Sequence, residues 1–165
     1  MTIREKYLES SVLIRFADCD PLNHLNNARY VDYFMNARED HLMHFYDMTI
    51  YDIAKKTGKT WVVTENRIAY IRPAWLMETV VIQSSLVRVA EKGLWVEMHM
   101  YNEDKTELKA LLWSKLAHYD MKTKRAVPHD EDIMLDLKSV EVPLSPDITF
   151  EERIEQLKDS VAVAK

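Results

Sequence analysis

Residues 18–30 have the sequence DCDPLNHLNNARY, from Asp18 to Tyr30. This stretch holds two carboxylates, an imidazole and two adjacent amides. Asp, Asn and Pro favour irregular loops, and the segment that follows has helical periodicity. A helix N-terminus presents unpaired N–H groups and a partial positive charge, which favour an oxyanion developing on a substrate carbonyl. The residues alone leave two interpretations open: a polar loop that caps a helix, or a catalytic loop.

The pattern of apolar residues differs on the two sides of this loop. Before it, apolar side chains alternate over residues 12–16, which predicts a strand. After it, from about residue 27 to 47, they recur with a helical period, and Asn26 or Asn27 is the expected N-cap. A shorter amphipathic segment over 50–56 ends near a glycine and predicts a second helix.

The chain then becomes rich in strand-forming residues. Four apolar or alternating runs are separated by short connections: Trp61–Arg72, Thr79–Val89, Leu94–Tyr101 and Leu108–Ala117. The short connections predict that consecutive runs pair as an antiparallel meander. A strand, a long helix and a group of antiparallel strands together indicate the α+β class.

The chain is expected to form a single domain of residues 1–165, because its length suits one hydrophobic core. That core covers about residues 8–128, and Pro128 closes the strand region. A C-terminal extension follows, with a short helix over about residues 149–159. The capping-box spacing of Thr149-Phe-Glu-Glu152 predicts this helix.

Composition excludes several functional classes. Basic and acidic residues give 22 − 27 = −5, and no dense basic run occurs, so nucleic acid is not an expected partner. The two glycines, Gly58 and Gly93, lie far apart, which excludes a glycine-rich phosphate loop and a nucleophile elbow. The single cysteine fits a reducing compartment. Without a long apolar run or a leader pattern, the chain is expected to be cytoplasmic and to lack a membrane span.

Two other groups of reactive side chains are weaker candidates. Asp18 and Asp20 flank Cys19, and their negative charges oppose formation of a thiolate, so Cys19 is not expected to be a nucleophile. His41 and His44 are three positions apart in the predicted helix. A catalytic zinc site needs a third protein ligand and an open position, so we expect no metal here.

The stretch from Asp18 to Tyr30 resembles the D-x-D-x-x-G-H-[VL]-N-N-x-x-Y signature of hotdog-fold acyl thioesterases, the 4-hydroxybenzoyl-CoA thioesterase-like superfamily. A second stretch, Tyr70-Ile-Arg-Pro-Ala74, resembles the Y-x-x-P-A motif of the same proteins. The resemblance covers roughly residues 8–128. It implies a hotdog fold, in which an antiparallel sheet wraps around one long central helix. It also implies that two chains pair edge to edge as a homodimer, or assemble further as a homotetramer, with the active sites at the dimer interface.

The resemblance also implies an activity and roles for particular residues. The activity is hydrolysis of the thioester of a fatty or aromatic acyl-CoA, without a cofactor. Asp20 becomes the general base or nucleophile, and the start of the helix becomes the oxyanion hole. The implied catalytic residues are Asp20, His24 and Asn27. The implied substrate-binding residues are Asn26, Tyr30 and Tyr70.

One departure from the family pattern, and one difference from the plant acyl-carrier-protein thioesterases, lead to further expectations. The glycine that usually precedes the histidine is Asn23 here, and Asn is the next-best residue if the backbone needs a positive φ. Pro73 and Ala74 stand where plant acyl-carrier-protein thioesterases tend to carry an acid and a cysteine, which favours the coenzyme A branch. The alternatives are an acyl-carrier-protein thioesterase and a non-catalytic hotdog protein that binds acyl-CoA.

Overall fold

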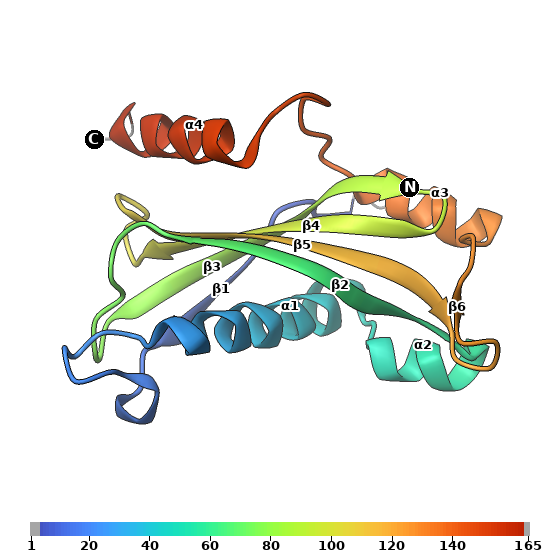
Figure 1. Cartoon of the computed structure of the whole chain (residues 1–165), viewed down its shortest axis with the longest axis horizontal. Coiled ribbons are helices and arrows are strands. Elements are labelled where there is room, and N and C mark those ends of the chain that lie inside the picture. Colours follow the sequence, from blue (N-terminus) through green and yellow to red (C-terminus); the bar gives the residue numbers. More distant parts are fainter. Residues whose placement is uncertain (1–3, 164–165) are drawn as a thin grey trace.

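The computed structural model describes residues 4–163 and shows an antiparallel sheet curved around one long helix (Figure 1). The strands are β1 (Leu8–Leu13), β2 (Lys59–Tyr70), β3 (Thr79–Ala90), β4 (Gly93–Asn102), β5 (Leu108–Asp120) and β6 (Arg125–Ala126). The helices are α1 (Tyr30–Tyr46), α2 (Ile50–Thr57), α3 (Glu131–Val140) and α4 (Phe150–Val163). Two short 3-10 helices, η1 (Phe16–Asp18) and η2 (Asn27–Arg29), flank the loop before α1. The predicted α+β class and the central helix are confirmed.

The strand order is β1-β3-β4-β5-β2, with β6 paired to β5. The expected meander therefore holds for β3, β4 and β5 but is wrong for β2. Strand β2 pairs antiparallel with β5, from Lys59 opposite Asp120 to Tyr70 opposite Ala110. Residues 71–78 form a longer connection than the turn between β3 and β4, which lets the chain cross to the other side of the sheet. As a result β1 and β2, which precede and follow α1, lie at opposite edges.

Two sequence predictions need correction. The first strand covers Leu8–Leu13 rather than 12–16, because its pairing with β3 ends where β3 begins at Thr79, and Phe16 lies exposed in η1. The C-terminal extension contains α3 as well as the predicted helix. Acidic residues in the first turn of α3 favour its N-terminus, and Val140 at its end is buried.

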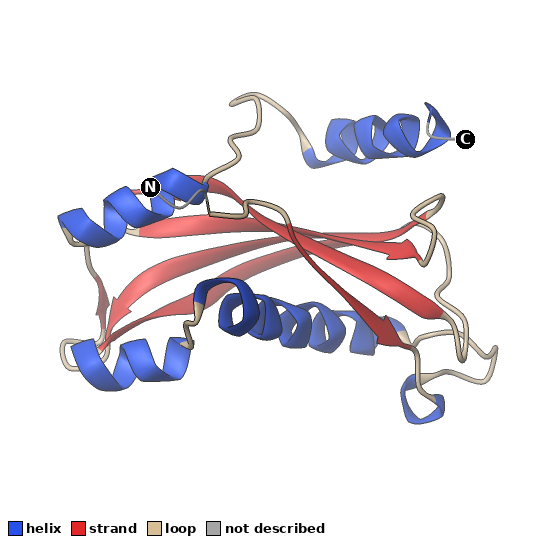
Figure 2. Cartoon of the chain, turned by 180° about the vertical axis from the view of Figure 1, so that it is seen from behind, coloured by secondary structure: helices blue, strands red, loops and turns tan. Residues whose placement is uncertain are grey.

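The inner face of the sheet packs on α1. Alternate residues of β3, β4 and β5 point to this face and form one apolar cluster with α1; its members include Phe34, Ile82, Met98 and Leu112. Figure 2, seen from behind, shows the strands curving over the helix. This packing fixes the start of α1, and the loop that precedes it, against the connection between β2 and β3.

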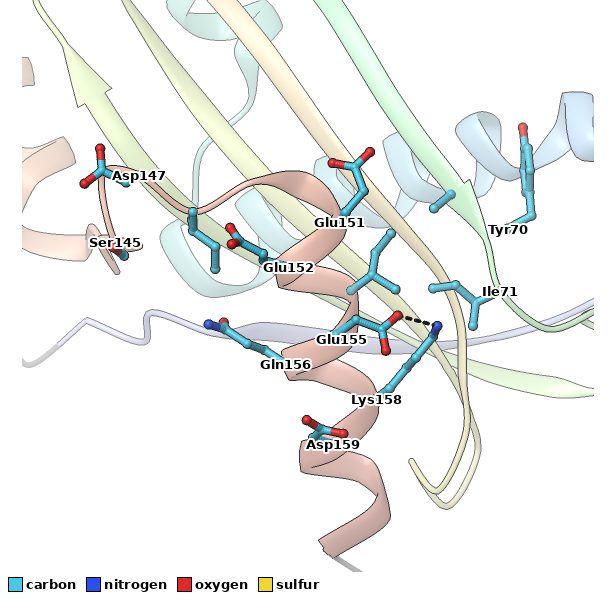
Figure 3. Close-up of a pocket in the computed structure, with 13 residues that line it drawn as sticks. Tyr70, Ile71, Ser145, Asp147, Glu151, Glu152, Glu155, Gln156, Lys158 and Asp159 are labelled. Carbon is cyan, nitrogen blue, oxygen red and sulfur yellow. Dashed lines mark hydrogen bonds and ion pairs between the residues drawn. The ribbon is translucent and has the colours of Figure 1, made fainter.

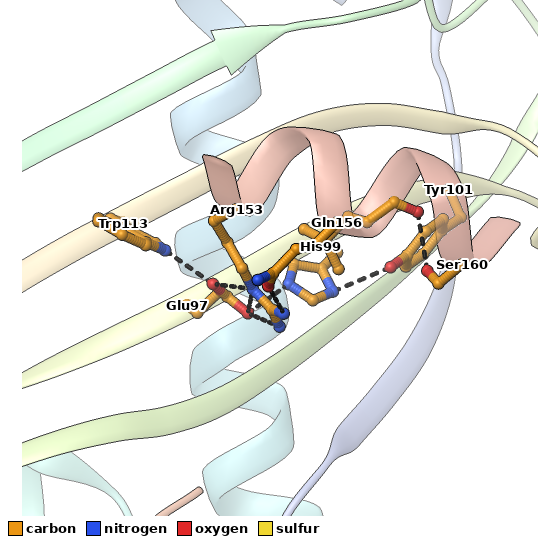
Figure 4. A network of polar contacts seen from close by, with 8 residues as sticks. Glu97, His99, Tyr101, Trp113, Arg153, Gln156 and Ser160 are labelled. Atoms are coloured by element: carbon orange, nitrogen blue, oxygen red, sulfur yellow. Dashed lines mark hydrogen bonds and ion pairs between the residues drawn. The ribbon is translucent and has the colours of Figure 1, made fainter. Parts of the chain in front are cut away.

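The outer face carries α4, which a buried polar network holds in place (Figure 4). The Arg153 guanidinium donates to both carboxylate oxygens of Glu97, at 2.7–3.2 Å, and the indole of Trp113 donates to the same carboxylate at 2.7 Å. The predicted capping box at the start of α4 is confirmed. Glu152 accepts from the Thr149 backbone N–H at 2.8 Å, and Thr149 Oγ1 accepts from the Glu152 N–H at 3.2 Å.

Candidate active site

The loop before α1 is folded by its own backbone and is joined to the second motif. The Asp20 N–H donates to the carbonyl of His24 at 2.9 Å, and the Asn23 N–H donates back to Asp20 at 3.0 Å. Asn23 has a φ of 62°, so the position where the family has glycine does adopt the left-handed conformation that Asn tolerates. The Leu25 N–H donates to the Ala74 carbonyl at 2.8 Å, which places the two sequence motifs side by side.

Asp20 and His24 form a pair on this loop. Asp20 Oδ2 lies 3.0 Å from His24 Nδ1, and Oδ1 accepts from the Leu22 N–H at 2.8 Å. The side chains remain 21% and 25% exposed, so solvent reaches both of them. The His24 ring packs edge-on against Trp75, with centroids 5.8 Å apart. A held carboxylate that water can reach is suited to act as a base or as a nucleophile.

Asp18 and Cys19 have other partners. Asp18 Oδ2 accepts from the Tyr33 hydroxyl at 2.8 Å, and Asp18 Oδ1 lies 3.7 Å from Arg29 Nε. Cys19 Sγ donates to the Arg15 carbonyl at 3.3 Å. Burial raises the pKa of the Cys19 thiol, and the charges of Asp18 and Asp20 raise it further. The thiol form is favoured, as the two flanking acids predict.

The two asparagines lie at the start of the helical region. Asn26 Oδ1 accepts from the Ala28 N–H at 3.0 Å, so Asn26 is the N-cap of η2. Asn27 is exposed, and its carbonyl accepts from the Tyr70 hydroxyl at 3.0 Å. Arg29, which precedes α1, makes no side-chain cap hydrogen bond to that helix. The N-terminus of α1, where a helix has its partial positive charge, lies at this end of the molecule, directly after η2.

Tyr30 and Tyr70 join the two motifs from opposite sides. Their rings meet edge-on with centroids 5.1 Å apart. Tyr30 is only 2% exposed, and its hydroxyl accepts from the Ala74 N–H at 3.2 Å, so it supports the loop from within. Burial raises the pKa of the Tyr30 hydroxyl. Tyr70, in contrast, is exposed.

Tyr70 also borders a groove of about 970 Å³ beneath α4 (Figure 3). The carboxylates that line this groove are Asp147, Glu151, Glu152, Glu155 and Asp159. Lys158 pairs with Glu155 at 2.8 Å, which leaves the groove acidic. An acidic surface repels phosphates, so the groove does not suit the nucleotide part of a coenzyme.

Within residues 4–163, no cluster of three or more His, Cys, Asp or Glu side chains has the geometry to hold a metal ion. His41 is instead buried between two serine hydroxyls, and His44 is exposed. In the same part of the chain, no helix is both long and apolar enough to cross a membrane.

Comparison with known proteins gives one curated relative and several solved structures. The long-chain acyl-CoA thioesterase FadM of Escherichia coli (strain K12) is 28% identical over 123 residues, covering 73% of this chain and 89% of FadM. The probable thioesterase YbaW from Escherichia coli has a TM-score of 0.72 at 23% identity, covering 82% of this chain and 99% of that one. SAV2348 from Staphylococcus aureus, solved in complex with CoA, has a TM-score of 0.76 at 14% identity, covering 93% and 95%. The two solved structures confirm the hotdog fold.

A profile described as the thioesterase-like superfamily matches residues 14–137. The match begins just after β1 and extends through the loop, α1 and the remaining strands into α3. It includes Asp20, His24 and the second motif, which the structure places side by side. The resemblance predicted from the two motifs is confirmed, and the chain belongs to the thioesterase-like superfamily.

Proposed function

We propose that the protein is an acyl-CoA thioesterase in which Asp20 is the general base or nucleophile. The observation that carries the proposal is the Asp20–His24 pair, held 3.0 Å apart on a solvent-reachable loop just before α1. Relatives support the substrate class, because FadM is named for long-chain acyl-CoA and SAV2348 was solved with CoA.

The chemistry needs an oxygen nucleophile and a site for negative charge. As a base, Asp20 takes a proton from water while the water oxygen attacks the thioester carbonyl carbon. Alternatively, a carboxylate oxygen attacks directly and forms a mixed anhydride that water then hydrolyses. In both routes the carbonyl oxygen becomes negative near the first N–H groups of α1, and the C–S bond breaks to release the thiolate. His24, Asn26 and Asn27 line the thioester, and Tyr70 borders it.

A hydrolysis panel tests this proposal. Purified protein is incubated with acyl-CoA esters of increasing chain length and with an aromatic acyl-CoA, and released thiol is measured. We expect clear turnover with at least one class. Binding without turnover across the panel would instead identify a non-catalytic acyl-CoA-binding protein. The corresponding acyl-carrier-protein esters are assayed in parallel, and turnover of these esters alone would identify an acyl-carrier-protein thioesterase.

We further propose that two chains pair through the free edge of β2. Within residues 4–163, β2 is hydrogen-bonded to β5 on one side and to no strand on the other. A long open edge of this kind favours pairing with a second chain. Large apolar side chains near the catalytic loop are also exposed: Leu22, Trp75 and Met77. A partner subunit that covers them would turn the open loop into an enclosed site.

Light scattering at micromolar concentration should therefore give at least twice the 19.5 kDa mass of one chain. In a two-fold pairing along the whole of β2, Thr64 and Glu65 lie next to the symmetry axis. Thr64→Glu brings additional like charges together there, and should shift the protein towards the monomer. Thr64→Ser is the matched control and should retain the wild-type mass. A monomeric wild type would contradict this proposal.

A further inference from the structure

A separate cavity of about 730 Å³ lies between α1 and the inner face of the sheet. Its walls are largely apolar and include Leu42, Trp61, Met98 and Leu137. Side chains of α2 and α3 complete it, and Figure 1 shows both helices at the far end of α1 from residues 18–30. The 17 residues of α1 span about 25 Å, and no residue of the proposed catalytic loop, residues 18–29, lines the cavity.

Arg38 of α1 brings a positive charge to this apolar space. Its Nη1 donates to Ser84 Oγ at 3.1 Å. The Ser84 hydroxyl also lies 2.8 Å from His41 Nδ1, and His41 Nε2 lies 2.9 Å from Ser10 Oγ. Burial and the neighbouring Arg38 lower the pKa of His41 to about 4, so His41 is neutral at pH 7. The only hydrogen-bond partner of the guanidinium in residues 4–163 is therefore a hydroxyl in a neutral chain.

No carboxylate in the described part of the chain forms an ion pair with Arg38. Two of the acids at the cavity rim pair with other residues. Glu39 accepts from the Tyr51 hydroxyl at 2.7 Å, and Asp136 lies 3.5 Å from Arg4. Desolvation lowers the pKa of Arg38 to about 10. The Arg38 side chain is partly buried. Its guanidinium has five N–H donors, and withdrawing several of them from water without an anion is costly.

Ser114 of β5 provides a second unsatisfied group in the same cavity. It is 1% exposed, and its Oγ has no hydrogen-bond partner among the described residues. Ser84 pairs with Met98 of β4 and Ser114 pairs with Val96, two positions along the same strand. Both hydroxyls therefore lie on the inner face that α1 covers. Buried hydroxyls are normally hydrogen-bonded, so the Ser114 hydroxyl can offer a hydrogen bond to a ligand in this cavity.

We propose that this cavity binds an alkyl carboxylate. The carboxylate pairs with the guanidinium of Arg38, the Ser114 hydroxyl donates to it or to a second oxygen of the ligand, and the hydrocarbon fills the apolar walls. A cavity of this volume is within the range that holds a ligand of drug size. The carboxylate has two sources: a free fatty acid, or the far end of a dicarboxylic acyl thioester. Binding of the free acid does not depend on the proposed hydrolytic activity.

Titration calorimetry with dodecanoate and with 1-dodecanol tests the proposal, because the two share a chain and differ in charge. Wild type should bind dodecanoate more tightly. Arg38→Met should lower the affinity for dodecanoate at least tenfold, since a charge-assisted hydrogen bond is lost. The affinity for dodecanol should change little. Arg38→Lys should retain part of the preference, which separates loss of charge from misfolding. Arg88→Met, at an exposed arginine stacked on Trp95, is the matched control and should bind like wild type.

Equal binding of acid and alcohol, or dodecanoate affinity unaffected by Arg38→Met, would overturn the proposal. Loss of dodecanoate binding in Asp20→Asn would also overturn it, because the acid would then occupy the catalytic loop. Whether the carboxylate belongs to a free fatty acid or to a dicarboxylic acyl thioester is decided by comparing hydrolysis of dodecanedioyl-CoA with that of dodecanoyl-CoA. A preference for the diacid that Arg38→Met removes identifies the thioester, and equal rates identify the free acid. Inactivity towards both esters, with dodecanoate binding intact, contradicts the proposed hydrolysis but supports the proposed carboxylate site in the cavity.

Discussion

Asp20→Asn should lower kcat for the best acyl-CoA by about 10²–10⁴-fold, with KM changed little. The amide has nearly the same shape, and its oxygen can still accept from the Leu22 N–H that holds Asp20 Oδ1 at 2.8 Å. It cannot take a proton from water and is a poor nucleophile. The loop therefore stays folded while the reacting group is removed.

Substitutions of the two preceding residues are the controls. Asp18→Asn should have a smaller effect, because Asp18 is bound to Tyr33 and lies near Arg29, where it supports the loop. Cys19→Ala should remain close to wild type, since burial and the two neighbouring acids keep its thiol protonated. Activity should be followed by thiol release, with melting temperature as a check on folding. A near-normal Asp20→Asn combined with collapse of either control would show that the reacting group lies elsewhere.

The loop over residues 18–30 could be predicted from sequence because its contacts are local. Asp20 and His24 are four positions apart, and the turn that joins them is made by the backbone between them. Asn23 adopts the left-handed conformation, which agrees with an asparagine at the position of the family's glycine. The strand order was harder to predict. Pairing of β2 with β5 joins residues far apart in sequence, and only the length of the 71–78 connection indicates that β2 does not pair with β3.

The polar groups of the cavity were missed for a related reason. Arg38 lies one helical turn from Phe34 and three positions before His41, on the buried side of α1, and a charged residue on an apolar face is a signal that sequence reasoning could have used. Ser114 gave no such signal, since small polar residues are common in strands. Its lack of a partner is a property of the assembled sheet and helix. The same holds for the contact between Glu97 and Arg153, which lie 56 positions apart.

Glu97→Ala should lower the free energy of unfolding by about 3–5 kcal/mol, the largest stability effect that we expect in the chain. Glu97 is 1% exposed, and its removal leaves the Arg153 guanidinium and the Trp113 indole without their shared acceptor. The matched control is Glu151→Gln, in the same helix as Arg153, which breaks an exposed ion pair with Arg67 of β2. Exposed pairs contribute little, so the control should lose less than about 1 kcal/mol. Denaturant unfolding measures both values.

The carboxylate of Glu97 should also make the free energy of unfolding depend on pH. Burial alone would raise the pKa of Glu97, but hydrogen bonds from His99 and Arg153 lower it from 4.5 to about 2. The unfolded chain then binds a proton more readily than the folded one. The contribution of Glu97 is therefore complete above about pH 4.5 and is lost as the pH falls towards 2. It amounts to roughly 3 kcal/mol. Other carboxylates titrate in this range, so the informative quantity is the difference between wild type and Glu97→Gln. That difference should shrink as the pH falls from 5 to 2, and a difference that stays constant would show that Glu97 is not held as a charged partner of Arg153.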